Sequence, residues 1–435
     1  MGQIRNLSTS KRMATSMEKP EAIVLAQPQR MFSIDALRGF DMFWIVGGEV
    51  AVQTWLKYSH LRAGNPAQDE SSWQMLLHRQ LEHAKWEGFR FYDLIFPLFL
   101  FIIGVVIPIS FQKMRTQGAT SKAILWRILK RVLLILAFGL VYNNILSFDS
   151  TQIRYAGVLQ RLALGYGFAA LCVVFLSVRW ISLLTAGLLL GYYLLLLLVP
   201  PPGGVAGDIT MQGNLSAYVD TLILKNAWGG IILKEYYGYG DNEGILSTIP
   251  AFATALLGVL AGYWLLSSRL PRQKFLGLLW SGLILLAFGA AWSGFFIDIN
   301  NLHDRLPVFP IIKNLWTSSY VLWAGGWSLI LLALFYGVID VVGWKAWSWP
   351  FAIIGANAIT IYLLDHFIDF MPLSKKMFGG FAHLAVSWLH PSAEANVTDQ
   401  ALVLTLTTAI LLTGALIIKW LLLWFLYRKK IFLRA

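Results

Sequence analysis

The stretch HAKWEGFRFYDLIFPLFLFIIGVVIPISF, residues 83–111, decides how the rest of the sequence is interpreted. It opens with ionisable side chains and continues without a break into an apolar run; these side chains are His83, Lys85, Glu87, Arg90 and Asp93. Roughly 20 apolar residues suffice to span a bilayer. Lysine and arginine alone would mark the boundary of such a helix. A membrane boundary alone therefore does not account for the histidine and the two carboxylates.

The composition predicts an all-α, polytopic membrane protein. Of 435 residues, 57% are hydrophobic and 13% are charged, with a mean hydropathy of +0.61. A soluble domain is about half apolar and about a quarter charged. The 19 tryptophans and 16 tyrosines suit two water–lipid interfaces. The net charge of +12 is spread over short connections, which favours the lipid bilayer as partner and argues against nucleic acid.

The cysteine content and the first residues exclude other classes. A single cysteine, Cys172, rules out an intrachain disulfide and a cysteine-based metal site. The HExxH pattern is absent, so no metal cofactor is expected. Residues 1–30 are polar and basic without an apolar core, so we expect a cytoplasmic N-terminal tail and no signal peptide.

About ten segments are long and apolar enough to be expected as spanning helices. They are 34–56, 91–113, 123–146, 156–177, 180–200, 245–267, 275–297, 315–339, 349–371 and 401–427. Three short basic connections, 113–122, 177–180 and 267–274, lie on the same side as both basic termini, which the positive-inside rule makes cytoplasmic. Residues 31–435 then form one transmembrane domain. Its outer loops are expected near 57–90, 200–244, 298–314 and 372–400.

Polar residues gather at the outer ends of the expected spans. They are Glu49, Asp93, Gln160, Arg161, Asn314, Asp365 and His366. Polar groups within spans are costly and usually face a cavity or another helix. Helix ends are also polar in general, but several of these residues lie within apolar stretches. The set therefore favours a polar chamber near the outer face.

Basic residues gather at the opposite, cytoplasmic end of the second and third expected spans. They are Arg115, Lys122, Arg127, Lys130 and Arg131. Positive-inside anchoring accounts for them without any further function. They would also suit the phosphates of an anionic cytosolic cofactor.

Six blocks occur in an order that resembles a known family. They are SIDALRGFDMFWIVGGE (33–49), HAKWEGFRFYDLIFPLFLFIIG (83–104), GVLQRLALGY (157–166), GILSTIPAFATALLGVLAGYWL (244–265), PIIKNLWTSSYVLWAGG (310–326) and NAITIYLLDHFIDF (357–370). Together they resemble the heparan-α-glucosaminide N-acetyltransferase family of transmembrane acyltransferases, particularly its shorter, bacterial-type members. The resemblance covers nearly the whole chain after residue 30.

The resemblance implies transfer of acetyl from cytosolic acetyl-coenzyme A to an amino sugar across the membrane. In a bacterial-type member this is the cytoplasmic (inner) membrane, and the family also suggests a homodimer. The functional histidine of the family falls on His83, and two further family positions fall on Asn314 and His366. Glu49 stands where the lysosomal enzyme has an active-site asparagine. The outer loop before His83 is also longer here.

Acetyl transfer to an amine needs a base, a held thioester and donors for the developing oxyanion. His83 is suited to act as the base or as a covalent acetyl carrier. Glu87, on a helical turn after His83, would orient the ring or bind a sugar, with Glu82 and Asp93 as rivals for that role. Glu49 would polarise His83 or receive the acceptor's ammonium group. Expected to bind substrate or acyl group are Asn314, Trp316, Gln160, Arg161, Asp365 and His366.

Two other classes of function compete with the enzyme. A transporter or flippase for a sugar or glycolipid would favour midplane polar sites and an internal repeat. The sequence shows no evident repeat, and its polar groups gather at one end. A scaffold or sensor would not bind acetyl-coenzyme A at all.

Overall fold

The structure is a computed structural model that describes residues 31–66, 68–231, 240–294, 308–389 and 397–432. The expected tail 1–30 and parts of all four expected outer loops lie outside these residues. The described chain is built from helices, and its β pairing is limited to one antiparallel bridge, between Glu87 and Ile312. The expectation of an all-α membrane protein is confirmed.

The α-helices follow one another along the whole chain. They are α1 (Phe32–Phe43), α2 (Glu49–Arg62), α3 (Trp73–Gln80), α4 (Ile95–Thr116), α5 (Ser121–Tyr142), α6 (Val158–Phe175), α7 (Val178–Leu198), α8 (Leu215–Asp220), α10 (Thr248–Leu266), α11 (Pro271–Ser293), α13 (Ser318–Tyr336), α14 (Trp349–Ala356), α15 (Ala358–Phe367), α16 (Met371–Leu389) and α17 (Val397–Arg428). Side-chain caps fix several starts: Thr120 accepts from Ala123 N before α5, and Ser72 accepts from Met75 N before α3.

Seven helices within the described residues are long and apolar enough to cross a membrane, or eight if α14 and α15, bent by 64°, form one span. The expected count of ten is therefore not confirmed. The expected span 34–56 is divided by a break between α1 and α2. The expected span 123–146 is helical as α5, but its first half carries several basic residues. Segment 371–389, expected within an outer loop, instead forms α16.

Close helix crossings depend on small residues. At Gly104 of α4, an added Cβ would lie 2.0 Å from the carbonyl oxygen of Ala255 in α10. At Gly258 of α10, an added Cβ would lie 2.0 Å from the carbonyl oxygen of Phe101 in α4. Only glycine permits this approach from both sides, so α4 and α10 form the tightly packed centre of the bundle.

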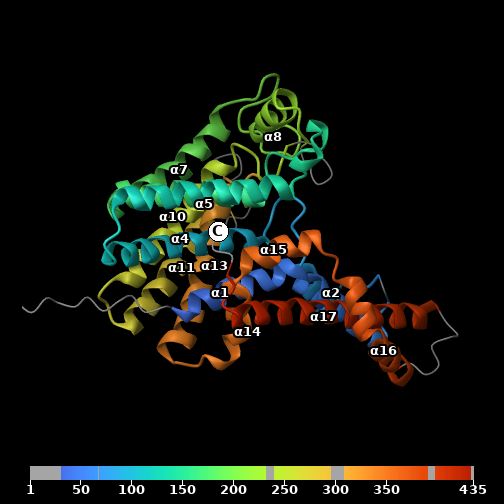
Figure 1. Cartoon of the computed structure of the whole chain (residues 1–435). Helices are drawn as coiled ribbons and strands as arrows, with labels where there is room; N and C mark the ends of the chain where they lie inside the picture. Colours follow the sequence, from blue (N-terminus) through green and yellow to red (C-terminus); the bar gives the residue numbers. More distant parts are fainter. Residues whose placement is uncertain (1–30, 67, 232–239, 295–307, 390–396, 433–435) are drawn as a thin grey trace, which may run out of the picture.

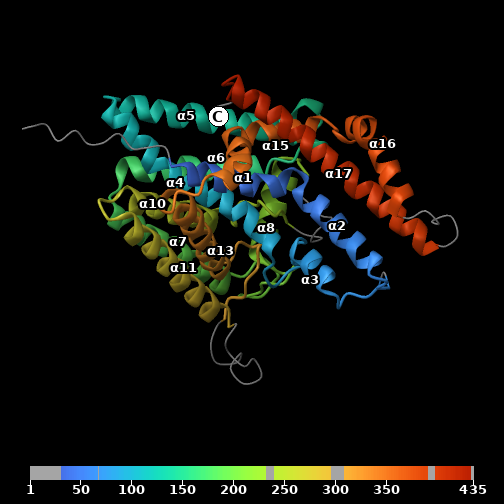
Figure 2. The same ribbon diagram turned by 90° about the horizontal axis from the view of Figure 1, so that it is seen from below.

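Figure 1 shows α4, α5, α7, α10, α11 and α13 gathered in one bundle, from which α16 and α17 extend. Figure 2 shows α17 running along α2, with α16 packed against α17 on its outer side. The Ser374 hydroxyl of α16 donates to the Leu411 carbonyl of α17 at 2.6 Å. The α2–α17 contact places the C-terminal helix beside the break that precedes α2.

The break between α1 and α2 is a π-helical turn, Trp44–Gly48, that contains non-helical backbone. Gly47 has φ = 110°, which a residue with a side chain rarely adopts. Lys419 of α17, 8% exposed, donates to the carbonyl of Val46 at 2.7 Å and forms an ion pair with Asp365. These contacts hold the break in place, and Glu49 is the first residue beyond it.

Replacing Lys419 tests the importance of this contact. Lys419→Met should lower the thermal unfolding midpoint in detergent, because Asp365 and the Val46 carbonyl lose their partner, at a cost of about 1–3 kcal/mol. Lys429→Met, at the exposed end of the same helix, is the control and should leave the midpoint unchanged. Equal midpoints for the two variants would contradict the assigned role.

Candidate functional site

The loop before α4 is shaped by hydrogen bonds to a second loop, far along the chain. Gly88, at φ = 113°, turns the backbone, and its N–H donates to the Ile311 carbonyl at 2.9 Å. The Glu87–Ile312 bridge adds a second tie. Residues 81–90 are therefore not helical, and the expected helical turn from His83 to Glu87 is wrong. The Glu87 side chain is exposed.

Asp93, in the 3-10 turn Phe91–Leu94 that opens α4, organises this loop. Its side chain is fully buried. Oδ2 accepts the backbone N–H groups of Ala84 at 3.1 Å and Arg90 at 3.0 Å, which caps the turn. Oδ1 lies 2.9 Å from Nδ1 of His83. Of the three carboxylates expected to compete for the ring, Asp93 is in contact with it.

Glu82 has other partners. It accepts from Arg90 at 2.9 Å and lies 3.6 Å from His78. Arg90 also donates to the His83 carbonyl at 3.2 Å, so the backbone of the histidine is fixed from the side opposite its ring.

Lys313 approaches the same ring from the second loop. Its Nζ lies 2.8 Å from Nδ1 and 3.3 Å from Nε2 of His83, and 3.3 Å from Oδ1 of Asp93. The lone-pair directions of the two ring nitrogens diverge, so an atom this close to both lies over the face of the ring. The in-plane partner of Nδ1 is therefore Asp93. Because a carboxylate only accepts, Nδ1 carries the hydrogen and Nε2 of the neutral ring keeps its lone pair.

The Lys313 side chain is 16% exposed, whereas the His83 side chain is 42% exposed, so a substrate can reach the ring. Burial lowers the pKa of Lys313, and the charge of Asp93 offsets part of this effect. Glu243 and Glu49 also lie close enough to raise the pKa of Lys313. The segments that carry Asp93, Glu243 and Glu49 thus bring negative charges close to the positive charge of Lys313, which lies in a fourth segment.

The second loop is held by Thr317, the N-cap of α13. Its hydroxyl donates to the Pro310 carbonyl at 2.9 Å and accepts from Ile312 N at 3.1 Å. Tyr320, one turn into α13, donates its hydroxyl to the backbone carbonyl of Asp93 at 2.8 Å. These bonds fix the position of Lys313 relative to His83.

Glu49 also lies close to His83. Its carboxylate is hydrogen-bonded by Tyr92 and Gln53, and its charge interacts with His83. The Tyr92 ring packs on the His83 ring with centroids 4.8 Å apart. The expected association of Glu49, His83 and Asp93 is therefore present.

The residues expected to bind substrate lie around this centre in different ways. Trp316 is 1% exposed and has φ = 53°; its indole N–H donates to Thr254 at 3.1 Å. Arg161 is 1% exposed, lies over the Trp316 ring and donates to Ser247 and the Gly244 carbonyl. Its Nε and Nη1 have no partner among the described residues. Trp316 and Arg161 are therefore buried and support the site from the interior of the bundle. Asn314, next to Lys313, is 7% exposed.

Three other residues that were expected to bind substrate have partners elsewhere in the bundle. Gln160, 6% exposed, lies against Gly139 and Gly157. Asp365 is paired with Lys419, as described above. The His366 ring stacks on Tyr142 with centroids 3.7 Å apart. None of these three has a described contact with His83.

An acidic cluster lies close to Arg161, in the segment 200–244. Arg154 donates to Asp241 and Glu243, and this pairing raises the pKa of Arg154. Asp220 is 1% exposed and accepts from the N–H groups of Asp241 at 3.2 Å and Ile245 at 2.8 Å. Burial raises the pKa of Asp220 to about 7.

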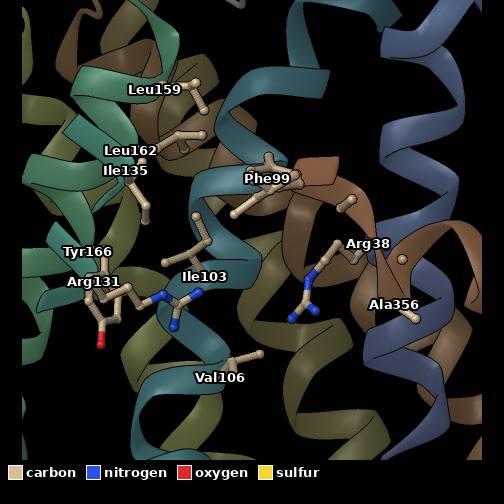
Figure 3. A pocket seen from close by; sticks show the side chains of 13 residues that line it. Arg38, Phe99, Ile103, Val106, Arg131, Ile135, Leu159, Leu162, Tyr166 and Ala356 are labelled. Atoms are coloured by element: carbon tan, nitrogen blue, oxygen red, sulfur yellow. The ribbon is translucent and has the colours of Figure 1, made fainter. Parts of the chain in front are cut away.

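Towards the basic end of the bundle, a cavity of about 250 Å³ lies between α1, α4, α5, α6 and the α14–α15 bend. Figure 3 shows Arg38 and Arg131 directed into it from opposite sides, between Phe99, Ile103 and Tyr166. The Arg131 guanidinium lies over the Tyr166 ring, and its Nε has no partner among the described residues.

Of the five basic residues expected to bind an anionic cofactor, Arg131 alone lines this cavity. The others have exposed side chains at the end of α4 and along α5; they are Arg115, Lys122, Arg127 and Lys130. The described residues contain no group of three histidine, cysteine or acidic side chains that would hold a metal ion.

Sequence reasoning missed Lys313, Arg38, Tyr92 and Glu243 as parts of the site or the cavity. Signals for two of them were present. Lys313 directly precedes Asn314 in the KNLW block, and Arg38 is a charge within an expected span, which is usually functional. Tyr92 and Glu243 carried no such signal, because their importance depends on which loops meet.

No protein-family model matches the chain. It is 27% identical to human heparan-α-glucosaminide N-acetyltransferase over 353 residues, 69% of this chain and 51% of that protein. The mouse protein of the same name is also 27% identical, over 348 residues, 68% of this chain and 51% of that protein. The chain is a distant relative of the heparan-α-glucosaminide N-acetyltransferases. It spans about half the length of these curated relatives, and the expected family resemblance is confirmed.

The pKa of Asp220 gives a prediction for stability. An unfolded aspartate has a pKa near 3.9, so between roughly pH 4 and 7 the folded chain binds the additional proton. Stability should fall as the pH rises through this window and show no further loss from this group above about pH 7. Asp220→Asn should flatten the dependence of the unfolding midpoint on pH. An unchanged slope in this variant would contradict the assignment.

Proposed function

We propose that the chain is a transmembrane N-acetyltransferase. It moves acetyl from cytosolic acetyl-coenzyme A to the amine of a glucosamine-type sugar on the extracytoplasmic side. Two curated relatives carry the name of such an enzyme. The observation that carries the proposal is the contact of His83 Nδ1 with the buried Asp93, which leaves Nε2 available for chemistry.

In direct transfer, Nε2 of His83 takes a proton from the acceptor amine while the amine nitrogen attacks the thioester carbon. The C–N bond forms, the C–S bond breaks, and the departing thiolate takes the proton from the ring. In the alternative, Nε2 attacks the thioester carbon first, the C–S bond breaks and coenzyme A leaves as the thiolate, which takes a proton from solvent. The amine then attacks the acetyl group on the ring, the bond from this group to Nε2 breaks, and Nε2 takes the amine proton. Both routes need the lone pair on Nε2. In both, Asp93 stabilises the tautomer that carries the hydrogen on Nδ1.

The acceptor side is acidic. An amino sugar carries an ammonium group at low and neutral pH, and the charges of Glu49 and Glu243 interact with Lys313, which contacts His83. Carboxylates at these positions would attract the ammonium group and hold it near the base. Glu49 thereby supplies a charge where the lysosomal enzyme has a neutral asparagine.

The donor side is basic. Arg38 and Arg131 in the cavity would bind the polar pantetheine arm or a phosphate of coenzyme A. A second, narrow cavity of about 20 Å³ shares Phe99, Leu159 and Leu162 with the first and reaches Phe96 and Tyr362. Phe96 packs on Trp316 beside the site. A path through the first cavity and then the second would lead the pantetheine arm to His83. The second cavity must widen when the arm enters.

The decisive experiment measures thioester cleavage by the purified protein with a panel of amino sugars. Glucosamine-type amines should accelerate release of coenzyme A. His83→Ala should reduce turnover by about 10²–10⁴-fold or more, because the base or acetyl carrier is lost. His78→Ala, in the preceding helix, should keep turnover. A fully active His83→Ala variant would end the assignment.

The donor cavity is tested with Arg131. Arg131→Ala should raise KM for acetyl-coenzyme A roughly tenfold, the equivalent of about 1.4 kcal/mol. Arg131→Lys keeps the charge and should lie between this variant and the wild type. Arg179→Ala, exposed at the start of α7, is the control. If Arg131→Ala and Arg179→Ala have the same KM, the donor does not use this cavity.

A further inference from the structure

Lys313 places a primary amine against the ring of His83. Its Nζ is within 3.3 Å of both ring nitrogens, over the ring face. An acceptor amine that gives its proton to Nε2 needs a similar distance but lies in the ring plane, a position that Nζ would reach by rotation about the bonds of its own side chain. Lys313 also resembles the proposed acceptor in chemistry, since both are primary amines.

Burial makes Lys313 more reactive than an exposed lysine. Its side chain is 16% exposed, and the lowered pKa increases the fraction in the neutral, nucleophilic form. The ion pair with Asp93 favours the protonated form, so reaction at Nζ is expected to be slower than transfer to a bound sugar.

We propose that Lys313 is a site of self-acetylation, used when the thioester is bound and no acceptor amine is present; this inference rests on the proposed function. The Lys313 ammonium first loses one proton to solvent, and the neutral amine then attacks the thioester carbon while Nε2 of His83 takes a second proton from Nζ. The C–N bond forms, the C–S bond breaks, and coenzyme A leaves as a thiol after receiving the proton from the ring. The product is Nε-acetyllysine.

Acetylation would switch the site off. The amide is stable, so it does not pass the acetyl group on. It removes the charge that pairs with Asp93 and places an acetyl group against the face of His83. An incoming amine then finds its position occupied.

The full-length protein in detergent is incubated with acetyl-coenzyme A carrying a labelled acetyl group, without acceptor, and its peptides are analysed by mass spectrometry. One acetyl group is expected on Lys313, stable to neutral hydroxylamine, which would remove an acetyl-imidazole. Added glucosamine should suppress the label. Glucosamine turnover measured after pre-incubation should fall in proportion to the labelled fraction.

Variants separate the alternatives. Lys313→Arg and His83→Ala should both lose the label. Lys85→Arg, which removes an exposed lysine in the same outer region, should keep it. An unlabelled Lys313 in protein that acetylates glucosamine would overturn this inference alone. Equal labelling of Lys85, or a labelled Lys313 in His83→Ala, would also overturn it. Protein that neither turns over nor becomes labelled would refute the proposed function as well.

Discussion

The buried carboxylate of Asp93 is the group on which the local structure depends. A charge without solvent is tolerated only when hydrogen bonds and opposite charges surround it. Asp93 obtains these from two backbone N–H groups of its own loop, from His83 and from Lys313. The requirement to satisfy one side chain therefore fixes the loop, the start of α4 and the ring orientation together.

The rest of the bundle serves to bring distant segments to this carboxylate. The α4–α10 crossing fixes the start of α4, and the bond from Tyr320 ties α13 to it. The break after α1 directs Glu49 towards the ring, and Lys419 supports that break from the C-terminal helix. Acidic groups then lie close to His83, while Arg38 and Arg131 lie further along the bundle in the cavity between α1, α4 and α5. Under the proposed function, this separation of charge would suit two substrates that approach from opposite sides.

The sequence predicted the helical class and most helix positions, because apolar runs of spanning length are a strong local signal. It also predicted His83, Asp93 and Glu49, whose ionisable groups are unusual next to such runs. It did not predict the break at Gly47, α16 or the extended loop around Glu87. These depend on contacts with α17 and with residues 308–317, which are distant in the sequence. Lys313 was overlooked for the same reason, since it reaches His83 through contacts between distant loops, the Glu87–Ile312 bridge and the bond from Gly88 to Ile311.

The most direct measurement is an experimental structure of the protein with a non-hydrolysable acetyl-coenzyme A analogue. The account predicts that the arm passes between Arg38 and Arg131 and that the carbonyl carbon lies within about 3.5 Å of Nε2 of His83. An acetyl end bound elsewhere, with the Arg38–Arg131 cavity empty, would contradict it.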